Sequence, residues 1–198
     1  MTRISRLTDQ LFTGADLPRH SSEAWLSELQ RWQQLGVTHV VDNRIEASDL
    51  DLMAEHAPEI DYLENGEDDY GQQMPDAWFD DGVRYAAAAM TDSSARVHVH
   101  CHMGINRGPS MAYAVLLATG HQPVSAISLI RRVRPVSAVA YAEQSLDWWH
   151  RVDGVAPAQR RQDQRELAAW RAANPHDTVR IIQRVHDGEM RARMSRGA

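Results

Sequence analysis

The stretch that decides the fold is Arg96-Val97-His98-Val99-His100-Cys101-His102-Met103-Gly104-Ile105-Asn106-Arg107, which is followed by Gly108-Pro109. Residues 96–100 are rich in β-forming residues and predict a strand that ends at the cysteine. Pro109 suits the first turn of a helix, which we expect to run to Thr119 and to end at Gly120. A strand, a tight loop and a helix in this order form a nest of backbone amides that can hold an anion.

The residues of this loop predict phosphate chemistry. Gly104 supplies the permissive φ that a tight turn needs. Arg107, six positions after the cysteine, is predicted to return beside it and to grip two phosphate oxygens at once. The amides, the positive helix end and Arg107 all favour the thiolate of Cys101, which is then a nucleophile. The predicted phosphate-binding residues are His102, Met103, Gly104, Ile105, Asn106 and Arg107.

The rest of the chain alternates short strands with helices and predicts an α/β fold. We expect a central, mostly parallel (mixed) sheet of about four to five short strands, flanked by helices. The expected strands cover residues 4–7, 10–13, 37–41, 60–63 and 96–100. The expected helices cover residues 21–36, 48–56, 109–119, 123–134 and 141–150, with another that starts at Pro75. Residues 64–74 are acidic and aperiodic and are predicted to form a functional loop.

A change in composition at residues 154–157 suggests two parts. Residues 1–152 are predicted to be the catalytic domain, and residues 153–198 an Arg-rich helical C-terminal extension. The extension would hold a helix over about residues 158–173, a break at Asn174-Pro175 and a second helix from Asp177. We expect these helices to pack on the domain or on a partner.

Composition narrows the class of protein. The chain has 198 residues, of which 43% are hydrophobic and 24% charged, as in a globular protein. A net charge of −6 argues against a general nucleic-acid binder. The longest apolar stretch, residues 111–118, is too short to cross a membrane, and the N-terminus has no apolar signal segment. One cysteine makes no internal disulfide. We therefore expect a cytoplasmic protein that needs no membrane and no cofactor.

The cysteine region has two other interpretations. A lone cysteine is commonly a small buried hydrophobe. His98, His100 and His102 could also form a metal site with Cys101, but no pair of residues has the usual zinc-ligand spacing. We expect no metal, and we expect His100 to hydrogen-bond the backbone of the loop.

The run from His100 to Arg107 resembles the His-Cys-x5-Arg (CX5R) signature of protein tyrosine phosphatases. The chain up to about residue 150 resembles their compact dual-specificity branch. The landmarks lie in family order at residues 11–14, 35–41, 112–113 and 134–135. Low-molecular-weight phosphatases carry Cys-x5-Arg near the N-terminus, so the mid-chain position favours the dual-specificity branch. The resemblance implies a protein phosphatase that forms a phosphocysteine intermediate and is inhibited by vanadate.

The resemblance also implies a general acid, an aspartate on a loop about thirty residues before the cysteine. Asp69 lies 32 residues before Cys101 and ten before Phe79, which matches the family spacing best. The neighbouring Asp68 is the alternative. The expected substrate is a phosphotyrosine or a phosphoserine/threonine of a protein rather than a phosphoinositide, because the loop carries no second cationic residue.

Two positions depart from the family pattern. Gly108 stands where the family usually has a serine or threonine whose hydroxyl assists hydrolysis of the intermediate, and Ser110 is expected to point elsewhere. The usual asparagine after Arg134-Pro135 is also missing, which affects how the back of the loop is supported. Because of Gly108, we expect either slowed breakdown of the phosphocysteine or a substitute for the missing hydroxyl, such as a water. The alternative is an impaired module that binds phosphorylated partners without turning them over. The sequence does not indicate the oligomeric state.

Overall fold

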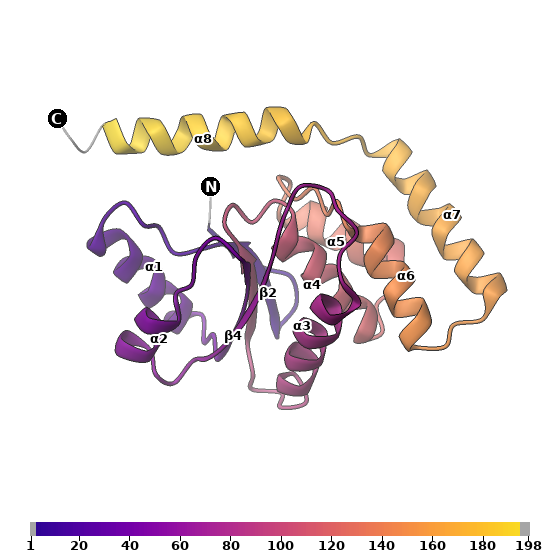
Figure 1. Ribbon diagram of the computed structural model, residues 1–198, viewed down its shortest axis with the longest axis horizontal. Coiled ribbons are helices and arrows are strands. Elements are labelled where there is room, and N and C mark those ends of the chain that lie inside the picture. The colour runs from indigo at the N-terminus through magenta and orange to yellow at the C-terminus, as the bar shows by residue number, and fades with distance from the viewer. Residues whose placement is uncertain (1–2, 195–198) are drawn as a thin grey trace.

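A five-stranded sheet forms the centre of the protein in a computed structural model that describes residues 3–194 (Figure 1). The strand order is β1-β2-β5-β3-β4. Strand β1 pairs antiparallel with β2, and the other neighbours are parallel. The predicted mixed, mostly parallel sheet of an α/β fold is thus confirmed. The bounds of the strands are β1 Ile4–Arg6, β2 Leu11–Ala15, β3 His39–Arg44, β4 Asp61–Glu67 and β5 Val97–Cys101.

Strand β5 is the middle strand and is buried along its whole length. Val97 and Val99 point to one face of the sheet and join the larger hydrophobic core. His98 and His100 point to the other face, where the His98 ring packs edge-on against Trp32 with 4.6 Å between ring centroids. A strand that is buried on both faces has a continuous run of β-forming residues, and this run predicts the strand from sequence.

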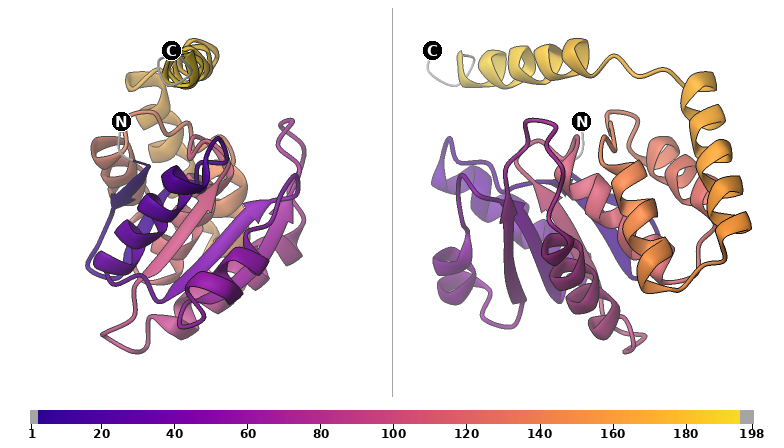
Figure 2. Two further views of the ribbon diagram at one scale, coloured as in Figure 1. Left: turned by 90° about the vertical axis from the view of Figure 1, so that its left-hand side faces the viewer. Right: turned by 45° about the vertical axis from the view of Figure 1, so that its right-hand side comes forward.

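Helices cover both faces of the sheet (Figures 1 and 2). Helices α1 and α2 supply the smaller core, together with residues from the strands and loops. Helices α3 to α6 supply the larger core on the opposite face. Helix α1 begins where Ser21 caps it by accepting a hydrogen bond from the Ala24 amide at 3.1 Å. The bounds are α1 Ser22–Gln34, α2 Leu50–His56, α3 Asp76–Ala89, α4 Arg107–Ala118, α5 Pro123–Val133 and α6 Ala142–Val152.

The predicted loop over residues 64–74 is wrong in its first part. Strand β4 continues to Glu67, because Glu64 pairs with Asp42 and Glu67 with Arg44 of the neighbouring β3. Only one of the seven residues of β4 is buried, so the strand shows no alternating apolar pattern. The pairing with β3, which the sequence pattern did not predict, extends β4 up to the start of the following loop.

The C-terminal part forms two helices, α7 (Pro157–Ala173) and α8 (Thr178–Met194). Helix α7 packs along α5 and α6, and its Leu167 is 1% exposed within the larger core. A buried hydrogen bond joins His150 Nε2 of α6 to Asp163 Oδ2 of α7 at 2.8 Å. Helix α7 is therefore firmly attached to the rest of the fold. Within residues 3–194, no helix has the length and apolar character needed to cross a bilayer.

Truncating the buried side chain of α7 is expected to destabilise the whole fold. Leu167→Ala removes core contacts and should lower the free energy of unfolding by about 2–5 kcal/mol. Urea denaturation followed by circular dichroism measures this change. Val179→Ala, at a position of α8 that is 67% exposed, is the control and should change stability little. Equal effects of the two substitutions would contradict the integral packing of α7.

Candidate active site

The carboxyl ends of β2, β3, β4 and β5 meet at one edge of the sheet, where α/β proteins commonly bind ligands. A cavity of about 300 Å³ lies at this edge. Cys101 and Arg107 line it, and so do Glu46 from the segment after β3 and Asp69 from the segment after β4. The structure therefore brings the three predicted catalytic residues to one cavity.

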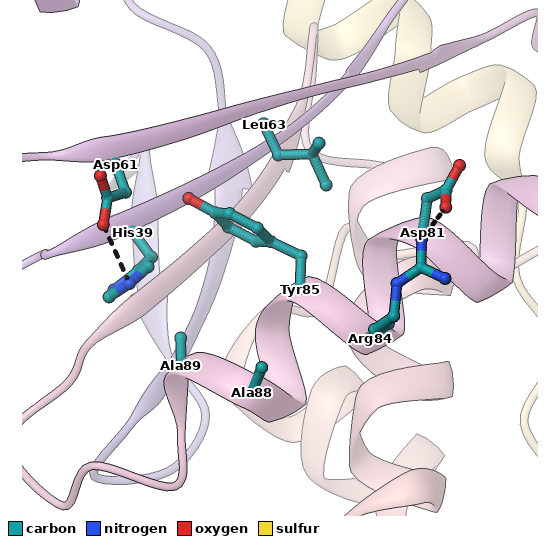
Figure 3. A pocket seen from close by; sticks show the side chains of 8 residues that line it. All are labelled: His39, Asp61, Leu63, Asp81, Arg84, Tyr85, Ala88 and Ala89. Carbon is teal, nitrogen blue, oxygen red and sulfur yellow. Dashed lines mark hydrogen bonds and ion pairs between the residues drawn. The ribbon is translucent and has the colours of Figure 1, made fainter.

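A second cavity, of about 360 Å³, opens at the amino ends of β3 and β4, beside α3 (Figure 3). Its ionisable side chains already have partners, because His39 Nε2 lies 3.4 Å from Asp61 Oδ2 and Arg84 pairs with Asp81. Burial and the nearby Asp61 raise the pKa of Tyr85, so this phenol stays protonated and is a poor nucleophile. The first cavity is therefore the candidate for covalent chemistry.

The loop after β5 is fixed from outside through its carbonyl groups. The His102 carbonyl accepts a hydrogen bond from the Asp16 amide at 3.3 Å, and the Ile105 carbonyl accepts one from the Ala138 amide at 2.7 Å. Arg134 donates to the two carbonyls between them, from Nε to Gly104 at 2.7 Å and from Nη2 to Met103 at 3.1 Å. Four consecutive carbonyls of the loop are thus held by groups around its outer side.

This anchoring determines where the amides of the loop point. In a trans peptide the N–H points opposite to the C=O of the same peptide unit. The amides of residues 103–106 are therefore directed to the inside of the loop, around the side of Cys101. Gly104 has φ 62°, and a Cβ there would lie 2.3 Å from the Gly14 carbonyl carbon, so only glycine fits. The resulting ring of amides is suited to an anion such as phosphate.

Arg134 provides the support for the loop that the missing asparagine after Arg134-Pro135 would be expected to give. Arg134 is 3% exposed, and its guanidinium supports the back of the loop. Burial lowers the pKa of Arg134 to about 10, so it remains charged at neutral pH. It also lies close enough to Cys101 to attract a negative charge on the sulfur. The loop is thus supported by a cation rather than by an amide side chain.

Arg107 is held by Glu46, a residue that the sequence analysis missed. Glu46 Oε2 accepts from Arg107 Nη1 at 2.8 Å, and Oε1 accepts from Nη2 at 2.7 Å. Burial opposes the charge of Arg107, but Glu46, Cys101 and Asp69 outweigh it and raise its pKa. The same hydrogen bonds lower the pKa of Glu46 to about 2. The pair therefore fixes the guanidinium with its charge intact over the neutral range.

Breaking this pair is expected to weaken catalysis without removing it. Glu46→Gln keeps the shape of the side chain but loses the carboxylate that accepts two hydrogen bonds from Arg107. Arg107 then becomes less well oriented, and kcat/KM should fall by about tenfold to a hundredfold. Because the pKa of Glu46 is lowered, its stabilising charge is present above about pH 5. The ratio of kcat/KM of the wild type to kcat/KM of the variant should therefore stay constant above that pH. Steady-state kinetics across pH measure this ratio. A ratio that changes steeply around neutral pH would contradict the assignment.

Asp69 is oriented toward the loop by two hydrogen bonds. Its Oδ1 accepts from Asn106 Nδ2 at 2.5 Å and from the Tyr141 hydroxyl at 2.9 Å. Its Oδ2 lies 3.5 Å from Arg107 Nε. Burial and the Asp69 charge raise the pKa of Tyr141 to about 12, so the phenol keeps the proton that it donates. Asp68, the alternative acid, is exposed and does not line the cavity.

The histidines around the cysteine are separated by the strand. His98 and His100 point away from Cys101, across β5, and their rings stack with 5.3 Å between centroids. His102 Nδ1 lies 3.0 Å from Asp16 Oδ2. Within residues 3–194, no cluster of three or more His, Cys, Asp or Glu residues is arranged to hold a metal ion.

The expected hydrogen bond from His100 to the loop backbone is wrong. Neither ring nitrogen of His100 has a hydrogen-bond partner among the described residues, and Nδ1 lies 3.8 Å from Asp42 Oδ1. Burial lowers the pKa of His100, which keeps the ring neutral. Its ring therefore fills the core on the face opposite the cysteine, and the loop is held by Arg134 instead.

Gly108 lies where helix α4 packs tightly against the backbone of β5. A Cβ at this position would lie 2.8 Å from the His100 carbonyl carbon and 3.0 Å from the Cys101 nitrogen. A serine or threonine would require α4 to shift, so the glycine is part of the packing. The hydroxyl of Ser110 is buried and interacts with the Tyr141 amide at 3.3 Å and with Asn106 Oδ1 at 3.4 Å.

No protein-family model matches the chain, and no curated protein sequence matches it either. Solved structures do match. PTPMT1 in complex with PI(5)P is 17% identical, with a TM-score of 0.63 over 77% of this chain and 98% of that one. Human DUSP28 is 17% identical, with a TM-score of 0.62 over 77% and 99%. Tk-PTP in the active form is 16% identical, with a TM-score of 0.55 over 83% and 95%. The chain therefore has the dual-specificity phosphatase fold.

Proposed function

We propose that the protein is a cysteine-dependent phosphatase that hydrolyses phosphate monoesters through a phosphocysteine intermediate. The observation that carries this proposal is the geometry of the loop around Cys101. Four of its carbonyl groups accept hydrogen bonds from outside the loop, so its amides are directed inward. The guanidinium of Arg107, held by Glu46, lies beside them. The fold likeness supports it, and PTPMT1 was solved with the phosphate ester PI(5)P. The sequence resemblance suggests protein-bound phosphotyrosine, phosphoserine or phosphothreonine as the substrate.

In the first half-reaction the Cys101 thiolate attacks phosphorus, and the bond from phosphorus to the ester oxygen breaks. The amides of residues 103–106 and the Arg107 guanidinium stabilise the charge on the transferred phosphoryl group. Asp69 gives its proton to the leaving oxygen, which departs as an alcohol or phenol.

In the second half-reaction a water attacks phosphorus, and the sulfur–phosphorus bond breaks. Asp69, now a carboxylate, takes a proton from this water, and inorganic phosphate and the thiolate of Cys101 are released. Both halves use the same two protein groups in opposite roles, so the catalyst returns to its starting state.

The second half-reaction is expected to be slow, because Gly108 offers no hydroxyl to the departing sulfur and Ser110 is engaged with Tyr141. Rapid mixing with a chromogenic phosphate ester should therefore give a burst of phenol release close to the enzyme concentration, followed by slower turnover. Acid quenching should trap the phosphoryl group on Cys101. Linear release from the first turnover, with no trapped intermediate, would show that the second step is not limiting.

The test of the proposed function is hydrolysis of a chromogenic phosphate ester and its inhibition by vanadate, a phosphate analogue. Purified protein should turn the ester over, and vanadate should compete with it. No turnover at any pH, together with no binding of phosphate or vanadate by calorimetry, would overturn the proposal.

A second candidate function is favoured by Gly108 alone. If the phosphocysteine breaks down too slowly for turnover, the protein is a module that binds phosphorylated partners. Retained binding of a phosphate ester with a single burst and no subsequent turnover would distinguish this module from an enzyme.

A further inference from the structure

Helix α8 contributes to the wall of the candidate active site. Thr178 and Ile182 of α8 line the same cavity as Cys101. The helix, drawn in yellow, runs across the face of the molecule at which the loops after the strands gather (Figures 1 and 2). Its 17 residues span about 25 Å. A segment more than 70 residues after the cysteine in the sequence therefore lies over the loop that surrounds it.

The start of α8 is positioned by the firmly packed α7. Arg171, near the end of α7, donates from Nη2 to the Val139 carbonyl at 2.6 Å, in the loop that borders the cavity. Val139 is buried and has φ 51°, an unusual value for a β-branched residue. In the connector between the helices, His176 Nδ1 lies 3.0 Å from Thr178 Oγ1. These contacts place the first turn of α8 at the cavity.

One side of α8 faces the protein, and the other faces solvent. Ile181, Ile182 and Val185 are half-buried, whereas Val179 and Met190 are 67% and 58% exposed. The spacing of three and four residues puts the half-buried side chains on one face of the helix. These three residues form a short apolar stripe on α8, and Ile182 is the member of it that lines the cavity.

The walls of the cavity indicate the kind of leaving group that fits. They are largely apolar, from Met103, Ile105, Ala138, Ala140 and Ile182. Glu46 and Asp69 add two carboxyl groups, while the Arg107 guanidinium is already engaged by Glu46. A volume of about 300 Å³ is at the lower end for small-molecule sites, about 300–1,000 Å³. A single phosphate with a compact, uncharged, apolar group fits this space, whereas further anionic groups would meet the Glu46 carboxylate.

We propose that α8 makes the site selective for small phosphate monoesters with apolar, uncharged leaving groups, and that it excludes phosphorylated segments of other proteins. The proposal rests on the phosphatase function, and it replaces the protein-bound phosphate suggested by the sequence resemblance with small phosphate esters as the substrate. A peptide that presents a phosphorylated side chain needs open space on both sides of the pocket mouth, and α8 occupies one side. Ile182 and Thr178 are thus specificity-determining residues.

The test changes the apolar stripe of α8 without adding charge near the phosphate. The variant Ile182→Gln/Val185→Gln should loosen the helix from the pocket. Its kcat/KM for a small aryl phosphate should fall by about tenfold, because a wall of the pocket is lost. Its kcat/KM for a phosphotyrosine peptide should rise by about tenfold, because the mouth is open. The matched control, Val179→Gln/Met190→Gln, changes two exposed positions of the same helix and should leave both values unchanged.

Opposite changes for the small and the large substrate are the signature of a selective wall, because general damage would lower both. Wild-type enzyme that hydrolyses the peptide as efficiently as the small ester would overturn the proposal. So would parallel changes for both substrates, or identical behaviour of the two variants. Calorimetry with the two α8 variants in a Cys101→Ser background measures the affinities for the small ester and for the peptide. It therefore tests the role of α8 in binding without the chemical step. Failure of the phosphatase function would instead appear as no hydrolysis of either substrate.

Discussion

Replacing Cys101 by serine is expected to lower kcat for a phosphate monoester by about 10⁴-fold or more. The serine hydroxyl is far less acidic than a thiol, so the amides and Arg107 that favour a thiolate do not supply an alkoxide at neutral pH. The chain has no second cysteine that could replace the first. Steady-state and single-turnover kinetics with the same ester measure the loss.

The substitution also separates binding from chemistry. The loop amides and Arg107 remain, so the serine variant should bind phosphotyrosine or inorganic phosphate with nearly unchanged affinity by calorimetry. An increase in melting temperature with phosphate would show that the variant is folded and its loop intact. Residual activity within tenfold of the wild type would show that Cys101 is not the nucleophile.

Replacing Asp69 by asparagine is expected to lower kcat by about 10²–10⁴-fold for esters whose leaving group is a poor one, such as an alkyl alcohol. Asparagine keeps the shape of the side chain but has no proton to give to the leaving oxygen. The loss should be much smaller for an ester of an acidic phenol, because such a leaving group departs without protonation. A series of aryl phosphates of graded acidity measures this dependence.

Asp68→Asn is the matched control, because it makes the same chemical change one residue earlier at an exposed position outside the cavity. It should leave the dependence on the leaving group unchanged. A larger effect at Asp68 than at Asp69 would transfer the role of the general acid to the neighbouring residue.

The elements that surround the cysteine could be predicted because each of their residues carries a local signal. Strand β5 is a continuous β-rich run, Gly104 and Arg107 stand at fixed offsets, and the spacing to Asp69 follows the family pattern. Local sequence was therefore sufficient for the sheet class and for Cys101 and Arg107, whereas the choice of Asp69 also needed the family resemblance.

The contacts that support the site could not be predicted, because they join segments distant in sequence. Glu46 reaches Arg107 across 61 positions, and Arg134 reaches Gly104 across 30. Strand β4 extends by pairing with β3 rather than by an apolar pattern of its own. The position of α8 at the cavity depends on the packing of α7, and no feature of residues 178–194 alone indicates it.

Val139, whose φ lies in the left-handed region, connects helix α7 with the loop that borders the cavity. Holding a β-branched residue at φ 51° costs about 1–3 kcal/mol, which the packing around Val139 and the hydrogen bond from Arg171 must offset. The neighbouring Ala138 amide bonds to the Ile105 carbonyl of the cysteine loop. If a ligand tightens this loop and thereby stabilises the docking of α7, thermodynamic linkage requires the docking of α7 to strengthen ligand binding by the same factor.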